Sequence, residues 1–206
     1  TQTAMVAPTT APTPAPSPAP TSAVASDLSV AEESYTKGNW SNAELLLSNY
    51  LKTNPNSIKA LVMRGNIYLA LNKVNQARAD LLRAVQLEPA SAEEYAYRAE
   101  AFMRFREPNS AISDLKKAIA KSPDKTSYYG QLAQVYVSQE KYDEALAQSE
   151  IMIKMTPDKV DGYIYKAQIY EAQKKFDLTI QTLKTAVKID PQSAMAFNNL
   201  AWAYAL

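Results

Sequence analysis

The chain has 206 residues with 22 basic and 21 acidic side chains, a formal net charge of +1 at neutral pH, and neither histidine nor cysteine. This composition excludes zinc sites, iron–sulfur clusters, disulfides, cysteine nucleophiles and serine–histidine–aspartate triads. The near-zero net charge argues against a chain built mainly to bind nucleic acid, and no apolar run reaches the roughly 18–20 residues that cross a bilayer.

The first 26 residues differ from the rest of the chain. They contain six prolines among alanines and threonines and carry no charge. Such a segment buries too little apolar surface to fold alone, and its prolines favour polyproline II. We therefore predict a disordered Pro/Ala/Thr-rich tether over residues 1–26 and a folded domain over residues 27–206. The alternative is a segment that lies along a partner surface or carries O-linked sugar.

A tether of this composition also bears on location. Linkers of this kind stand between a membrane anchor or export signal and a folded domain, although residues 1–26 themselves lack the basic start and apolar core of a signal peptide. An exported or membrane-tethered location, periplasmic or at the cell surface, is therefore favoured, with the cytoplasm as the alternative.

The prolines of the folded region show its organisation. Apart from Pro108, they recur every 34 residues without insertion, at Pro55, Pro89, Pro123, Pro157 and Pro191. A fixed period of this length is typical of a helical repeat array.

Helix-start signals follow the same period. One register contains only residues preferred at helix N-caps: Ser41, Asn75, Asn109, Asp143 and Asp177. A second register has Ser57, Ser91 and Ser193, with Asp124 and Asp158 one position earlier in their units. Ser41 with Glu44, and Ser91 with Glu94, have the spacing of a capping box. These signals predict helices over residues 29–38, 41–54, 58–71, 75–88, 92–105, 109–121, 126–139, 143–155, 160–173, 177–189 and 194–206.

Small and aromatic residues share the period. Small residues recur at Ala31, Gly65, Ala99, Ala133, Ala167 and Ala201, and aromatic residues three positions later at Tyr68, Phe102, Tyr136, Tyr170 and Tyr204. Small residues let two helices approach closely, and aromatic side chains fill the space beside them.

This pattern resembles the tetratricopeptide repeat over residues 24 to 206. The resemblance implies an all-α fold, a right-handed α-solenoid of helix-turn-helix units with five complete repeats and the first helix of a sixth. The unit's usual glycine is present only at Gly38, and Pro108 replaces an aromatic residue. Ser149 and Met152 replace the usual residues in the fourth unit, where we expect less regular packing.

The resemblance also implies a protein-binding groove lined by the first helix of each unit. The family's groove positions correspond here to Tyr35, Lys59, Met63, Asn66, Glu93, Tyr97, Glu100, Met103, Arg104, Gln131, Gln134, Ile164, Tyr165, Gln168 and Trp202. Tyr97 and Tyr165 share one groove position and are the favoured contacts, because tyrosine buries a large area and keeps a polar group.

The charges at the groove positions limit the kinds of partner that the groove can bind. Among the groove positions five are acidic (Glu32, Glu93, Glu100, Asp161, Glu171) and two are basic (Lys59, Arg104). Nucleic acid is therefore disfavoured as a partner. Some family members hold acidic chaperone tails in a carboxylate clamp, and this clamp is disfavoured too, because it needs cations at the positions that Glu93, Tyr97 and Glu100 occupy here. The adjacent carboxylates Glu32/Glu33 and Glu93/Glu94 point about 100° apart on a helix, so they do not converge as an acid–base pair.

We therefore expect a non-catalytic protein-interaction scaffold without cofactor or metal. One version is a structural or assembly subunit of a larger, membrane-associated complex, and the other is an adaptor or co-chaperone-like module that transiently captures peptide or helical segments. The last segment, residues 193–206, carries no charge. We expect Phe197, Leu200, Ala201 and Tyr204 to face the preceding helices, and the end of the array to be covered by further helices, a partner or a second copy.

Overall fold

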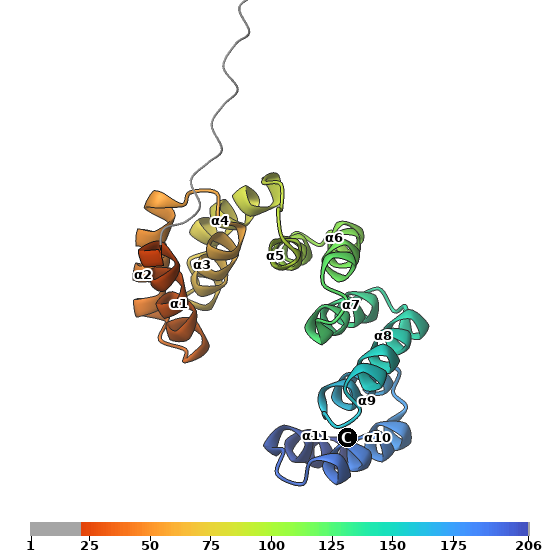
Figure 1. The fold of residues 1–206 in the computed structure, drawn as a ribbon. Helices are drawn as coiled ribbons and strands as arrows, with labels where there is room; N and C mark the ends of the chain where they lie inside the picture. The colour runs from red at the N-terminus through yellow and green to blue at the C-terminus, as the bar shows by residue number, and fades with distance from the viewer. Residues whose placement is uncertain (1–21, 206) are drawn as a thin grey trace, which may run out of the picture.

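The computed structural model describes residues 22–205, which form eleven α-helices and contain no strand (Figure 1). Successive helices pack against each other as helix-turn-helix pairs, and the pairs follow one another along an open arc. The helices are α1 (Ser22–Thr36), α2 (Trp40–Thr53), α3 (Ile58–Ala70), α4 (Val74–Gln86), α5 (Ala92–Arg104), α6 (Pro108–Lys121), α7 (Thr126–Ser138), α8 (Tyr142–Met155), α9 (Asp161–Ala172), α10 (Phe176–Ile189) and α11 (Ala194–Tyr204). The all-α solenoid of five pairs and one further helix is confirmed.

Ten of the helices begin and end within two residues of the predicted bounds, but the first does not. Helix α1 begins at Ser22, seven residues before the expected start. No proline follows Pro20 until Pro55, and the alanines at positions 23 and 25 favour a helix. Residues 22–26, which we predicted to be part of the tether, are therefore helical. The rest of the predicted tether, residues 1–21, lies outside the described part of the chain.

The turns inside the pairs explain why the second helices start early. One residue in each turn has a left-handed backbone with φ from 57° to 72°, at Gly38, Asn72, Arg106, Glu140 and Lys174. The N–H of the following residue then donates to the carbonyl oxygen five residues back, as Lys73 does to Tyr68 at 2.7 Å. This Schellman closure ends the first helix and starts the second within three residues.

The closure corrects the predicted caps of the second helices. Their N-caps are Asn39, Lys73, Glu107, Lys141 and Lys175. The predicted register from Ser41 to Asp177 lies two residues inside these helices. Ser41 and Glu44 form no capping box there, and the Glu44 carboxylate instead pairs with Lys73 Nζ at 2.8 Å.

The first helices mostly start as predicted. Ser57 and Ser193 accept backbone hydrogen bonds as N-caps, and Ser91 with Glu94 forms the full capping box. Asp124 and Asp158 are not caps, because α7 and α9 start after Lys125 and Val160 without a side-chain cap bond.

The core lies between the two layers of helices. The small residues Ala43, Ala77, Ala111 and Ala145 of the second helices are fully buried, and Thr179 holds the same place in the fifth unit. Leu47, Leu81, Leu115 and Leu183 are buried four residues later in the first, second, third and fifth units. In the fourth unit Ser149 is fully buried with its hydroxyl donating to the Leu146 carbonyl at 2.7 Å, and Met152 is buried as well. The buried apolar residues form three clusters along the array, so each unit is stabilised mainly by its neighbours.

Buried ion pairs join the layers. Arg98 donates to both carboxylate oxygens of Asp114, at 2.7 and 3.0 Å, and to the Leu87 carbonyl at 2.7 Å. Arg64 repeats the arrangement with Asp80 one unit earlier. None of the described helices combines the length and the apolar character needed to span a bilayer.

Candidate interaction groove

The first helices α1, α3, α5, α7 and α9 lie on the inner side of the arc, and three hollows follow one another along them (Figure 1). The proximal hollow has a volume of about 550 Å³ and collects residues from α1, α3, α5 and α7. It is lined by Tyr35, Asn66, Glu93, Ala96, Tyr97, Glu100, Ser122, Lys125, Ser127, Tyr128 and Gln131.

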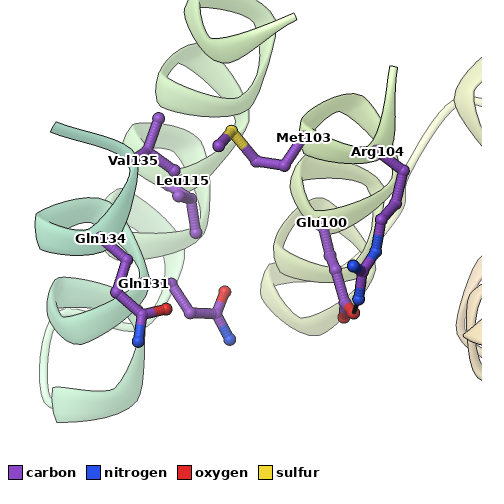
Figure 2. Close-up of a pocket in the computed structure, with 7 residues that line it drawn as sticks. All are labelled: Glu100, Met103, Arg104, Leu115, Gln131, Gln134 and Val135. Carbon is purple, nitrogen blue, oxygen red and sulfur yellow. Dashed lines mark ion pairs between the residues drawn. The ribbon is translucent and has the colours of Figure 1, made fainter. Parts of the chain in front are cut away.

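The central hollow lies between α5 and α7 and has a volume of about 500 Å³ (Figure 2). Met103 projects from α5 toward α7, and Leu115 of α6 lies behind the space between these helices. Val135 completes the apolar part, while Glu100, Arg104, Gln131 and Gln134 supply the polar part. Glu100 and Gln131 also line the proximal hollow, so the two hollows adjoin.

The distal hollow is smaller, about 110 Å³, and shares Gln134 with the central hollow. Its other residues are Ala133, Val137, Tyr165, Gln168 and Ile169. Gly130 shapes this part of the groove, because a Cβ there would lie 2.6 Å from Tyr165 Cζ. The missing side chain lets the Tyr165 ring lie against α7.

The charges of the groove are largely paired with one another. Lys59 Nζ lies 2.6 Å from Glu32 and 2.8 Å from Glu93, and so connects α1, α3 and α5. Burial lowers the pKa of Lys59, but its hydrogen bonds to Glu32 and Glu93 outweigh that effect and raise the pKa above its ordinary value. Lys59 is therefore a permanent cation that pairs with two of the five acidic side chains at the groove positions.

A second network lies at the rim of the central hollow. The Asn66 amide donates to Glu100 at 2.8 Å, and Arg104 donates to the Asn66 carbonyl oxygen at 3.3 Å. Glu100 and Arg104 are also 3.5 Å apart as an ion pair. This network holds both charged side chains of α5 toward α3.

Tyr35, Tyr97 and Tyr165 of the groove are half-buried phenols, and Tyr128 is buried. Burial raises the pKa of Tyr97 to about 12, and Lys59, 5.7 Å from the ring centre, opposes this rise. Burial also raises the pKa values of Tyr35, Tyr128 and Tyr165. These side chains remain neutral hydrogen-bond donors at physiological pH and offer apolar ring surface to a partner.

The structure brings most of the predicted groove residues together, with three exceptions. Met63 and Ile164 are 3% and 4% exposed, belong to core clusters and line none of the three hollows. Their positions point between helices rather than outward. Trp202 is 60% exposed on α11, where its Nε1 donates to Glu171 at 3.2 Å, and it lines none of the three hollows.

Several lining residues were not identified from the sequence. Ser127 shares the repeat register of Lys59 and Glu93, so the period could have identified it. Lys125 lies at the turn before α7 and adds a cation that the charge count did not include. Leu115 belongs to a second helix, and only the separation of α5 from α7 gives it access to the groove.

Comparison with known proteins agrees with this geometry. No curated protein sequence matches the chain. Similar solved structures include MamA, 26% identical over 83% of this chain and 93% of that one with a TM-score of 0.55. TTC0263 from Thermus thermophilus, described as a thermophilic TPR protein, is 23% identical over 89% of this chain and all of that one with a TM-score of 0.70.

A third similar structure is YrrB, described as a TPR protein with an unusual peptide-binding site, which is 17% identical over 87% of this chain and 91% of that one with a TM-score of 0.56. The sequence profile of the family described as tetratricopeptide repeat matches residues 62–126 and 131–194, more than half of the chain. The helical pairs, their constant period and this match together show that the chain belongs to the tetratricopeptide repeat family.

Proposed function

We propose that this protein is a non-catalytic interaction scaffold that holds segments of partner proteins in its concave groove. The observation that carries the proposal is the row of three adjoining hollows along the inner helices, in which neighbouring hollows share Glu100, Gln131 and Gln134. Concave surfaces of helical solenoids are extended binding surfaces. The peptide-binding site named in the description of YrrB supports the same use of the fold.

The chemistry of the groove favours a neutral or basic segment with apolar anchors. Glu93 remains 55% exposed although it contacts Lys59, and Glu100 remains 39% exposed beside Arg104. A basic side chain can still approach these carboxylates, whereas an acidic tail would meet like charge. The rings of Tyr35, Tyr97 and Tyr128 supply apolar area in the same hollow.

A capture experiment from the native source, with proteins identified by mass spectrometry, tests this function. We expect Tyr97→Ala and Tyr165→Ala each to weaken binding of the captured partner by more than ~1 kcal/mol, because half-buried aromatic side chains dominate such interfaces. Tyr142→Ala, on α8 in the outer layer, is the matched control. Unchanged affinity in both groove variants, with the fold retained, would place the binding site elsewhere.

A second version, a stable subunit of a larger assembly, is favoured by the exposed apolar side chains of α11. Met195, Phe197, Trp202 and Tyr204 are 46–60% exposed on this one helix. An assembly subunit stays with its partner through size-exclusion chromatography, whereas an adaptor exchanges it. The charge-free composition of residues 1–26 is the basis for proposing that such an assembly is exported or membrane-associated.

A further inference from the structure

The spacing of the inner helices is not uniform along the groove. Helix α3 packs directly on α5, and α7 packs on α9, whereas few residues approach each other between α5 and α7, as also between α1 and α3 and between α9 and α11. The central hollow fills the interval between α5 and α7 (Figure 2). At its base lie Leu115 and Val135, which are 1% and 3% exposed, and half-buried Met103 forms one wall. The groove therefore has an apolar position at this interval, between the third and fourth units.

The two walls of this hollow differ in hydrogen-bonding capacity. On the α5 side, Glu100 and Arg104 are engaged with each other and with Asn66. On the α7 side, Gln131 and Gln134 are three residues apart and share one face of the helix. The hydrogen bonds among residues 22–205 leave both side-chain amides without a partner, and Gln131 extends into the space between the helices. Each amide offers both donors and an acceptor.

We propose that the central hollow binds a non-helical segment of a partner protein, which inserts one bulky apolar side chain while Gln131 and Gln134 hydrogen-bond its main chain. This inference rests on the proposed function and specifies the ligand of the same groove. In the middle of a helix every main-chain N–H and C=O is already bonded, so a helical ligand offers nothing to the two glutamines. An extended segment presents free N–H and C=O groups, which a side-chain amide matches in pairs.

The apolar base of the central hollow determines which kind of partner side chain can insert. Leu115, Val135 and Met103 give a charged side chain that reaches the base of the hollow no polar partner, and a buried charge without a partner is costly. Glu100 and Arg104 lie at the rim, where they can still meet charged groups that flank the inserted side chain. The volume of about 500 Å³ holds a bulky apolar side chain together with the main chain that carries it. Leucine, methionine or phenylalanine fits the apolar chemistry of the base. Gln168 continues the polar track one repeat beyond Gln134, in the distal hollow.

A phage-displayed library of random twelve-residue peptides tests this inference. Selection is carried out on the complete chain, and enriched peptides are synthesised and measured against three variants by calorimetry. The variant Q131L/Q134L removes both amides at similar volume, Met103→Trp fills the hollow, and Gln181→Leu on α10 is the matched surface control. Circular dichroism and the thermal midpoint establish that each variant is folded.

We expect enriched peptides to share one leucine, methionine or phenylalanine and to be non-helical when bound by NMR chemical shifts. Their affinity should fall at least tenfold on Q131L/Q134L and on M103W and stay unchanged on Q181L. Methylation of the peptide's amide nitrogens beside the anchor should also weaken binding tenfold.

Peptides that bind as helices, or that bind Q131L/Q134L as tightly as the unaltered chain, would overturn this inference, and so would a library that yields no enriched peptide. The proposed function stands in the first two cases if Tyr97→Ala still weakens the same peptides. It fails as well if neither the tyrosine nor the glutamine variants change their binding.

Discussion

At the scale of single residues, the turns inside the helical pairs carry the most unusual backbone. Five equivalent residues adopt positive φ, and only Gly38 does so without a steric penalty. Arg106, Glu140 and Lys174 have long side chains in a conformation that costs roughly 1–2 kcal/mol for an L-residue. The sequence keeps the turn geometry at these sites because both helices that it joins are fixed by packing.

Replacing these residues by glycine should therefore stabilise the fold. We expect Arg106→Gly and Glu140→Gly each to raise the free energy of unfolding by up to about 1 kcal/mol. Glycine removes the steric cost of the left-handed backbone, but part of this gain is lost because glycine also gives the unfolded chain more conformational freedom. Urea denaturation measures the change. Lys116→Gly, at an ordinary position in the middle of α6, is the control and should be destabilising by about 1 kcal/mol. Loss of stability in the turn variants would contradict the argument.

The buried phenol of Tyr97 predicts a loss of stability in alkali. Its pKa is about 12 in the folded chain against an ordinary value of 10, so the folded state keeps the proton that the unfolded state loses. The stabilisation is complete below pH 10 and is lost as the pH rises toward 12. Urea denaturation at about pH 9 and about pH 11 measures this loss, because the second value lies between the two pKa values.

The variant Tyr97→Phe isolates this contribution, because it keeps the ring and removes the proton. We expect its stability to fall less between the two pH values than that of the unaltered chain. Tyr35, Tyr128 and Tyr165 also have raised pKa values, so the variant should retain part of the alkaline loss. An identical pH dependence in both proteins would show that Tyr97 does not contribute.

At the scale of elements, α11 is a first helix that no second helix covers among the described residues, and its exposed side chains reflect this. We expected Phe197, Ala201 and Tyr204 to face the preceding pair, but all three are exposed, while Ala196 and Ala203 are buried. The positions of Ala201 and Tyr204 normally pack on the second helix of their own unit, and no helix follows α11 among the described residues. The face of α11 toward α10 is therefore made by other residues.

This exposed face predicts self-association of the 206-residue chain. Light scattering at increasing concentration should show particles larger than a monomer, because exposed apolar surface of this kind associates. Appending a charged second helix after Leu206 should suppress the association and raise the thermal midpoint. A chain that stays monomeric at high concentration and gains nothing from the added helix would refute this prediction.

At the scale of the whole molecule, the arc is a linear array of neighbouring contacts. Its three core clusters are built from α1–α5, α5–α9 and α9–α11, so no single core holds the two ends together. Such arrays derive stability from each unit and its interfaces. Removing sequence at one end should affect only the adjacent unit.

Two truncations apply this reasoning to the N-terminal region. Deleting residues 1–21 should leave the thermal midpoint nearly unchanged, because that composition contributes little core, but should alter attachment or location in the cell. Deleting residues 1–26 also removes the first turn of α1 and should lower the midpoint further. Calorimetry compares the two. A large drop on removing residues 1–21 alone would show that they pack on the solenoid.

The sequence by itself determined the repeat, its period, the helices and the residues that line the groove in most units. It did so because a 34-residue period places equivalent residues on equivalent faces, and because small and aromatic residues in fixed register define which faces pack. Ser57, Ser91 and Ser193 could be identified as caps from local chemistry alone, since an N-cap bond joins residues three apart.

Only the tertiary structure decided where the second helices start, how the charged residues pair and how the inner helices are spaced. The early start of the second helices depends on a left-handed turn that four residues other than glycine adopt because packing imposes it. Two of the five acidic groove side chains, Glu32 and Glu93, pair with Lys59 although the three residues lie on three different helices. The apolar position between α5 and α7 exists because these helices are spaced apart, so that Leu115 of α6 lies at the base of the hollow between them. This spacing follows from the packing of whole helices, which no local pattern records.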